Sequence, residues 1–123
     1  MRLYGVRGAT TVDANEPEQI LGRTEELLRA LCEANRIEEG NVVSIIFTTT
    51  PDLNAEFPAK ACRLMGWNGA ALLGAVEADV PHGLPRCIRV LLHVYLEKGS
   101  RVKHIYLHEA VKLRPDLVEK ASS

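Results

Sequence analysis

The segment RCIRVLLHVYL at residues 86–96 constrains the fold more than any other part of the sequence. Apolar side chains occupy every second position, which is the period of a β-strand and not of a helix. One predicted face is purely aliphatic and consists of Ile88, Val90, Leu92, Val94 and Leu96. The opposite face consists of Cys87, Arg89, Leu91, His93 and Tyr95. The segment therefore predicts a strand that packs on a helix through one face and carries a cation on the other.

A long amphipathic helix would supply the partner for this aliphatic face. Mostly apolar side chains recur at helical spacing at Ile20, Leu21, Thr24, Leu27, Leu28, Leu31 and Cys32. Asn15 is expected to cap the helix, with Pro17 in the first turn and Glu18 at the capping-box position. The pattern predicts that the helix ends near Asn35.

The remaining segments predict further strands and one short helix. The apolar, β-branched or extended segments lie at residues 2–12, 42–49, 70–80 and 103–107. A short helix is expected from Pro58 to Met65, where Gly66 ends it. Residues 81–85 are expected to form a loop, and residues 113–117 a turn or a short helical piece.

This order of elements predicts an α+β fold, with a single mixed β-sheet packed on one long and one short helix. With 123 residues the chain fits one domain, expected at residues 1–117, followed by a flexible tail at residues 118–123. A hydrophobic content of 46% and a charged content of 25% are those of a globular protein that builds its own core.

Charge and hydropathy argue against two classes of partner. A net charge of −1 lacks the basic excess that proteins reading phosphate backbones usually carry, so nucleic acid is not an expected partner. The apolar runs are much shorter than a membrane span, and no secretory leader is recognisable. Three widely spaced cysteines are expected to be reduced core thiols, which places the protein in the cytoplasm.

Three charged residues stand where a plain core would not place them. Arg89 lies in mid-strand, Arg7 lies in the first strand between Gly5 and Gly8, and Glu77 is a lone carboxylate in AALLGAVEADV. A buried cation needs an anion or water. Either an internal salt bridge, with Glu77 as the partner, or a subunit interface would satisfy the arginines, and an anionic ligand is the other possibility.

A second cationic group is predicted on the short helix. Lys60 and Arg63 are three residues apart and share one helix face, and Phe57 forms an apolar lip before them. A solvated helix surface would explain the same pattern. Tyr106 offers a phenol near the C-terminal end, although a purely structural tyrosine fits there too.

The familiar catalytic motifs are missing from the sequence. It contains no P-loop, no G-x-G-x-x-G, no G-x-S-x-G and no local Cys/His nucleophile pair. His104 and His108 are four residues apart without a third ligand at metal spacing, so no metal site is expected. What remains is a set of cations, one carboxylate and one phenol, which suits an anionic ligand held by electrostatics.

Five segments together resemble the AroH class of chorismate mutases, the small trimeric α/β enzymes. They are RGATTV at 7–12, TPDLNAEFPAKACR at 50–63, VEADV at 76–80, CIRVL at 87–91 and HIYLHEAVKLRPDL at 104–117. The resemblance implies a cofactor-free Claisen rearrangement of chorismate to prephenate in phenylalanine and tyrosine biosynthesis. It also implies a homotrimer forming a pseudo-α/β barrel, with active sites between subunits.

The resemblance assigns roles to individual residues. Arg7 and Tyr106 would bind a substrate carboxylate, Arg89 would face the ether oxygen and a carboxylate, and Glu77 would meet the ring hydroxyl. The pocket would be completed by Phe57, Ala59, Lys60, Arg63, Leu113 and Arg114, with 57–63 supplied by the neighbouring subunit. Where some members have a cysteine this chain has Gly74, so only backbone contacts are expected there. No histidine is expected at the site.

Two other functions are compatible with the same scaffold. One is a non-catalytic trimer that binds a small anionic metabolite. The other is a structural trimer in which the arginines form interface salt bridges. Loss of Arg89 or Glu77 would have favoured either of these, and both residues are present.

Overall fold

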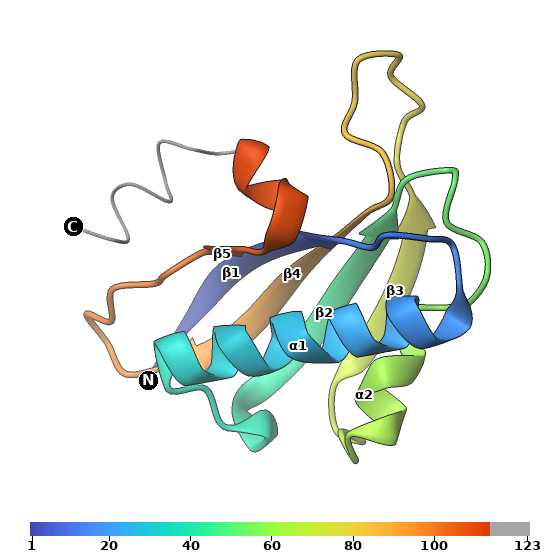
Figure 1. Ribbon diagram of the computed structural model, residues 1–123. Helices are drawn as coiled ribbons and strands as arrows, with labels where there is room; N and C mark the ends of the chain where they lie inside the picture. Colours follow the sequence, from blue (N-terminus) through green and yellow to red (C-terminus); the bar gives the residue numbers. More distant parts are fainter. Residues whose placement is uncertain (114–123) are drawn as a thin grey trace.

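The computed structural model of the chain describes residues 1–113 (Figure 1). The predicted tail at 118–123 and the predicted site residue Arg114 therefore lie outside the described residues. The elements in chain order are β1 (Arg2–Thr11), α1 (Pro17–Asn35), the 3-10 helix η1 (Glu39–Asn41), β2 (Val42–Thr49), α2 (Lys60–Leu64), β3 (Ala71–Val76), β4 (Cys87–Leu96), β5 (Ile105–Tyr106) and the 3-10 helix η2 (His108–Lys112).

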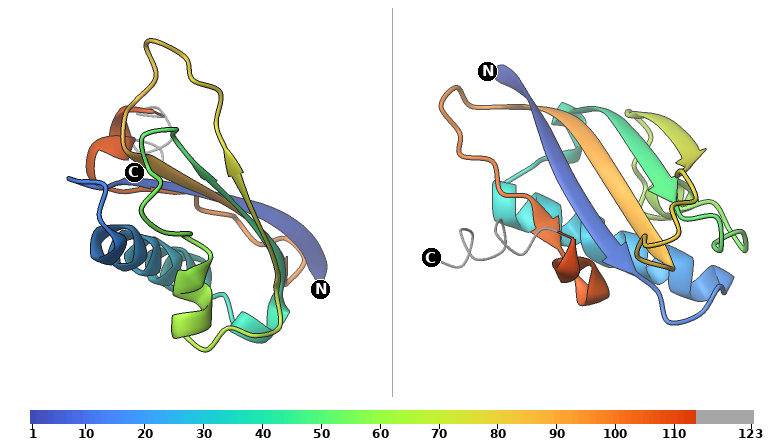
Figure 2. Two further views of the ribbon diagram at one scale, coloured as in Figure 1. Left: turned by 90° about the vertical axis from the view of Figure 1, so that its right-hand side faces the viewer. Right: turned by 90° about the horizontal axis from the view of Figure 1, so that it is seen from above.

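The five strands form one mixed sheet in the order β3-β2-β4-β1-β5. β4 pairs antiparallel with β1 and β2, whereas the outer pairs β2–β3 and β1–β5 are parallel. α1 and α2 lie on the same side of this sheet, and the short 3-10 helix η2 packs on the opposite face, where Ala110 meets Ala9 and Cys87 (Figures 1 and 2). The predicted α+β class, with one sheet on one long and one short helix, is confirmed.

The core lies between α1 and the sheet, as the alternation in residues 86–96 predicts. The aliphatic face of β4 is buried, with Leu92 and Val94 fully inaccessible. α1 turns Ile20, Thr24, Leu27, Leu28 and Leu31 inward. Burial of each such aliphatic side chain contributes about 1.5–3 kcal/mol, which makes this contact the main source of stability.

The start of α1 differs from the prediction. Glu16, not Asn15, is the N-cap residue, and it makes no side-chain capping bond. The Asn15 side chain instead accepts hydrogen bonds from the backbone N–H groups of Asn54 (3.1 Å) and Ala55 (3.0 Å). The tertiary contact thus recruits the polar side chain that local sequence rules assign to the helix.

Several helices and strands are also shorter than the sequence predicts. α2 begins at Lys60, not at Pro58, and Gly66 follows it with a left-handed φ of 82°. β3 ends at Val76, and residues 77–86 form a loop that protrudes from the end of the sheet (Figure 1). β5 is reduced to Ile105–Tyr106. These early strand ends leave the 77–86 loop beside the strand that carries Arg89.

Cys32, Cys62 and Cys87 are free thiols, as predicted. Burial raises the pKa of each of them to about 11, so all three remain protonated and unreactive near neutral pH.

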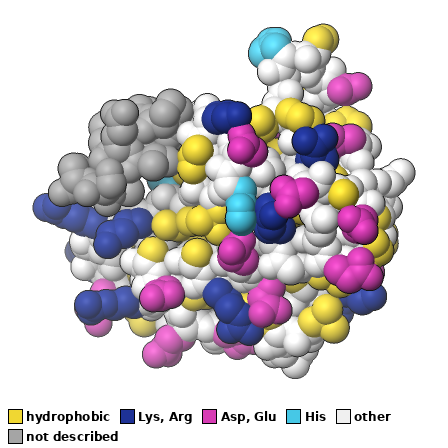
Figure 3. Space-filling model, viewed as in Figure 1, with side chains coloured by type: hydrophobic (Ala, Val, Ile, Leu, Met, Phe, Trp, Pro, Cys, Tyr) yellow, Lys and Arg dark blue, Asp and Glu magenta, His cyan; other side chains and the backbone are white. Residues whose placement is uncertain are grey.

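No helix within residues 1–113 is long and apolar enough to cross a membrane. On the face that includes α1, acidic and basic side chains are interspersed (Figure 3).

Gly8 allows α1 to approach β1 closely, which gives a test of the packing. A Cβ at this position would lie 2.9 Å from Leu31 Cδ1, 3.0 Å from Leu27 Cδ1 and 3.3 Å from the Ile105 carbonyl oxygen. Both leucines are fully buried, so a Cβ at this position would force buried side chains to shift. Gly8→Ala is therefore expected to lower the free energy of unfolding by about 1–3 kcal/mol in urea denaturation.

Gly22→Ala is the matched control. Gly22 is an exposed residue of α1, and a Cβ added there would meet no atom within 4 Å. Alanine is favoured over glycine in a helix by about 0.5–1 kcal/mol, so this variant should be more stable than the parent. Equal effects of the two substitutions would contradict the proposed role of Gly8.

Candidate active site

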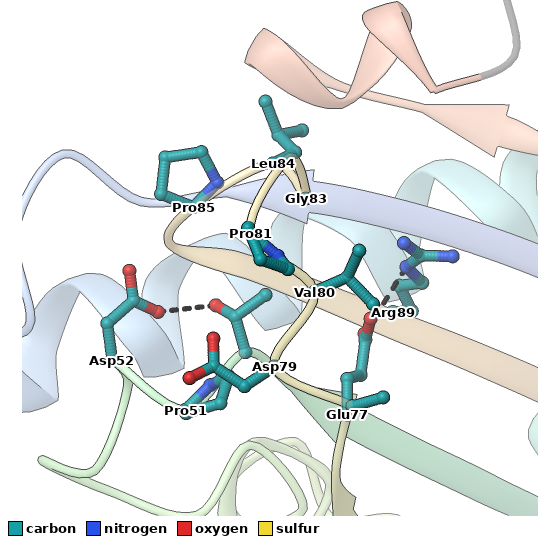
Figure 4. A pocket seen from close by; sticks show the side chains of 12 residues that line it. Pro51, Asp52, Glu77, Asp79, Val80, Pro81, Gly83, Leu84, Pro85 and Arg89 are labelled. Carbon is teal, nitrogen blue, oxygen red and sulfur yellow. Dashed lines mark hydrogen bonds and ion pairs between the residues drawn. The ribbon is translucent and has the colours of Figure 1, made fainter.

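Arg89 and Glu77 form an ion pair on the sheet face opposite α1. Arg89 Nε lies 3.2 Å from Glu77 Oε2 (Figure 4). The Arg89 side chain is 50% exposed, and the Glu77 side chain is 17% exposed. The internal salt bridge considered from the sequence is thus present, yet half of the Arg89 side-chain surface still faces solvent. The pairing does not exclude a ligand at Arg89.

Two neighbouring threonines on β2 position Glu77. The Glu77 backbone N–H donates to the carbonyl oxygen of Thr49 at 2.9 Å, which continues the parallel β2–β3 pairing past the end of β3. The Thr48 hydroxyl donates to Glu77 Oε2 at 2.6 Å. Sequence reasoning missed Thr48, because its position beside Glu77 depends on the strand register.

A second hydrogen-bond network fixes the start of β4. Asp52 accepts from the Thr50 hydroxyl at 2.5 Å and from the Arg86 backbone N–H at 2.9 Å. The Thr50 hydroxyl in turn accepts from the Cys87 backbone N–H at 3.0 Å. Arg86 has a left-handed φ of 49°, an uncommon conformation that these bonds help to hold. The network places the strand residue Arg89 at a fixed position relative to β2.

The loop after β3 and the end of β2 enclose a hollow of about 650 Å³ beside this ion pair. Figure 4 shows Glu77 and Arg89 at one side of it and the loop residues Val80, Pro81 and Leu84 around it. The hollow is open to solvent. Its lining combines apolar side chains with carboxylates, among them those of Asp52 and Asp79. It is large enough for a small organic ligand.

On its other side, Arg89 lines a second hollow of about 340 Å³, together with Arg7, Tyr106 and Leu113. The strand pairing brings these residues together, since Ala9 on β1 lies opposite Arg89 on β4 and beside Tyr106 on β5. Ala9 is small, so it leaves room between the two longer side chains. The structure thus brings four of the predicted residues to one hollow, and it joins them to Glu77 through Arg89.

One histidine contacts the backbone of a candidate residue, although neither of the two hollows around Arg89 is lined by a histidine. His104 Nδ1 accepts a hydrogen bond from the Arg7 backbone N–H at 3.0 Å. It thereby extends the short parallel β1–β5 pairing with a side-chain acceptor. His108 instead lies 2.7 Å from Glu26 Oε1 on α1, so the two histidines have different partners.

The second predicted group lies elsewhere on the chain. Phe57, which is 73% exposed, and Gly74 line a separate hollow of about 430 Å³ at the β3 edge of the sheet. Neither of the two hollows around Arg89 is lined by Phe57, Ala59, Lys60, Arg63 or Gly74. A Cβ at Gly74 would meet no atom within 4 Å, so packing does not require a glycine there.

The two cations of this second group, Lys60 and Arg63, both remain accessible to solvent. Lys60 Nζ lies 2.9 Å from Glu56 Oε1, and Arg63 is exposed. The hydrogen bond from Lys60, with another from the Phe57 backbone N–H, lowers the pKa of the Glu56 carboxyl below its usual value. Such a solvated ion pair is weak and can be exchanged for a ligand anion at little cost.

The chemistry of the Arg89 region favours binding and charge stabilisation. Its groups are two guanidinium ions, a carboxylate and a phenol, and the nearby Cys87 thiol is buried and protonated. Within residues 1–113 no group of three or more His, Cys, Asp or Glu side chains is placed to hold a metal ion. The arrangement is suited to an anionic ligand held by electrostatics.

Comparisons with known proteins agree with this description. Residues 3–117 match the model of the family described as chorismate mutase type I. The chain is 43% identical over 119 residues to the chorismate mutase AroH of Bacillus subtilis (95% of this chain, 94% of the relative). It is 48% identical over 115 residues to the enzyme of the same name from Thermus thermophilus (92% and 94%).

A solved structure shares the fold. The chorismate mutase of Clostridium thermocellum has a TM-score of 0.84 and 47% identity, with 87% of this chain and 96% of that chain covered. The family model spans both groups of candidate residues, and its range includes Arg114. On sequence and fold, the chain belongs to the chorismate mutase type I family.

Proposed function

We propose that this chorismate mutase rearranges chorismate to prephenate in the two adjoining hollows around Arg89. The observation that carries this assignment is the convergence of Arg7, Arg89 and Tyr106 around the small residue Ala9, with Glu77 ion-paired to Arg89. Chorismate has two carboxylates, an ether oxygen and a ring hydroxyl. Each of these groups finds a partner of matching chemistry in this set.

Arg89 has the main catalytic role in this proposal. The reaction is pericyclic, and the ether C–O bond breaks ahead of C–C bond formation, so negative charge develops on the ether oxygen. In this proposal the Arg89 Nε stays paired with Glu77, and the terminal nitrogens of the guanidinium face the substrate. A cation fixed before the reaction favours the charged transition state over the ground state, and the barrier falls.

The other residues hold the substrate in its reactive shape. Arg7 and Tyr106 bind one carboxylate, while Glu77 accepts a hydrogen bond from the ring hydroxyl. Chorismate must adopt a diaxial conformer that brings the reacting carbons together. Fixing both ends of the molecule on strands of one rigid sheet holds it in the reacting geometry, so that less of the barrier remains for the chemical step.

We further propose that each site is completed by a neighbouring subunit in a homotrimer. Phe57, Ala59, Lys60 and Arg63 lie outside the hollows around Arg89 of their own chain and form the second wall for another chain. The sheet face opposite α1 supports this assembly, since beyond the part covered by η2 it exposes apolar side chains such as Leu3, Leu73 and Tyr95. Packing these faces around a threefold axis would form a barrel with helices outside.

The relatives bear on the alternative function, and the cysteines bear on the cellular location. A non-catalytic anion binder has no support from the relatives, which are named as chorismate mutases. We place the enzyme in the cytoplasm because its three cysteines are free thiols, as is usual in a reducing compartment. Arg114, which follows the last described residue, stays a predicted pocket residue beside Leu113.

The role of Arg89 is tested by Arg89→Ala. Removing one donor aimed at developing charge typically lowers kcat by about 10²–10³-fold, and a full cation is expected to have at least that effect. The measurement is the loss of chorismate ultraviolet absorbance. Arg29→Ala, on the exposed face of α1, is the control and should keep the parent kcat. Turnover of Arg89→Ala within a few-fold of the parent would remove Arg89 from its catalytic role.

The pH dependence gives a second test. No proton is transferred in a pericyclic step, so kcat should be flat between roughly pH 6 and 8. His104 accepts from the backbone of Arg7, and Arg7 binds a carboxylate in both ground and transition states in this proposal. Any effect of His104 protonation should therefore appear in KM. A bell-shaped kcat profile in this range would indicate acid–base chemistry instead.

The shared site is tested by complementation between Arg63→Ala and Arg89→Ala chains. Each variant alone should be nearly inactive. After joint unfolding and refolding of equal amounts, random trimers would contain both intact residues at about one site in four. Activity should rise towards that fraction of the parent value. If mixed trimers form, as shown by mass spectrometry, and no activity returns, the site lies within one subunit.

A further inference from the structure

Thr48 lies between the two residues on which the proposed mechanism depends. In the sheet order β3-β2-β4, its strand separates the strand of Arg89 from the strand that ends before Glu77. The pairing places Thr48 directly opposite Arg89 on β4 and opposite Ala75 on β3. Its side chain lies on the same sheet face as the ion pair, because its hydroxyl reaches Glu77 at 2.6 Å.

Thr48 and Arg89 share one oxygen of the Glu77 carboxylate. Both the Thr48 hydroxyl (2.6 Å) and Arg89 Nε (3.2 Å) contact Oε2. No partner for Oε1 occurs among the hydrogen bonds and ion pairs of residues 1–113. The Thr48 hydrogen bond and the Arg89 ion pair both act on Oε2, which fixes the direction of the carboxylate and leaves Oε1 to accept from a ligand. Without the Thr48 hydroxyl, Glu77 Oε2 would keep only its ion pair with the half-exposed Arg89 side chain.

We propose that Thr48 is a positioning residue for the rearrangement, which acts by holding the Glu77 carboxylate. The backbone bond from Glu77 to Thr49 fixes the start of the side chain, and the Thr48 hydroxyl fixes its end. Glu77 in turn orients the Arg89 guanidinium through Nε. This inference rests on the proposed catalytic roles of Arg89 and Glu77, and it adds a residue that contacts neither the reacting atoms nor the carboxylates of the substrate.

The test compares Thr48→Val with Thr48→Ser. Valine has nearly the shape of threonine and lacks the donor, whereas serine keeps the hydroxyl. A hydrogen bond to a charged group has an energy that corresponds to roughly a 10- to 100-fold change in rate. We expect Thr48→Val to lower kcat by this factor with a smaller change in KM, and Thr48→Ser to stay within about threefold of the parent.

Thr24→Val is the matched control for the substitution. Thr24 is a buried threonine of α1 whose hydroxyl donates to the Ile20 carbonyl oxygen at 2.7 Å. This variant loses a hydroxyl bond of similar length away from the site, so its kcat should equal that of the parent. Urea unfolding of all variants separates loss of the folded state from loss of catalysis, and Thr48→Ala replaces Thr48→Val if the valine variant does not fold.

A double variant shows whether Thr48 acts through Glu77. In a Glu77→Ala background, Thr48→Val should change kcat by less than about twofold, because the carboxylate that it positions is gone. Persistence of the full loss in that background would overturn the proposal, as would parent-like kcat of Thr48→Val or equal losses in the valine and serine variants. Parent-like kcat of Glu77→Ala would instead overturn the site assignment itself.

Discussion

The antiparallel pairing of β1 with β4 is the interaction on which the rest of the structure depends. It places ten consecutive residue pairs in register, from Arg2 opposite Leu96 to Thr11 opposite Cys87. One face of this pair, aliphatic along β4, is buried under α1. The other face then has to carry the charged side chains at the middle of the two strands. Arg7 and Arg89 lie close together because the same register that builds the core also sets their spacing.

Two small residues in β1 serve opposite faces of that pair. Gly8 faces α1 and admits Leu27 and Leu31 to within about 3 Å of where a Cβ would lie. Ala9 faces the other way and separates Arg89 from Tyr106. Larger side chains would push the helix away at the first position and fill the hollow at the second. Stability and ligand access are therefore decided at adjacent positions of one strand.

The Arg89–Glu77 pair shows how one contact can serve both the folded chain and its chemistry. A half-exposed pair contributes little to stability. In the proposed mechanism its value lies in fixing the guanidinium before the ligand arrives, so that little reorganisation remains for the reaction. The end of β2 provides the support, through Thr48 and Thr49 to Glu77 and through Thr50 and Asp52 to the start of β4.

The sequence by itself determined the strand at 86–96, the helix that covers it and the unusual charges at Arg7, Glu77 and Arg89, because periodicity and burial cost are local properties. The resemblance to a family added the roles. Only the tertiary structure decided that Asn15 bonds to the 54–55 turn, that His104 supports Arg7 and that Thr48 holds Glu77. These contacts join residues at least 29 positions apart, and strand register, which no local pattern specifies, brings the last two pairs together.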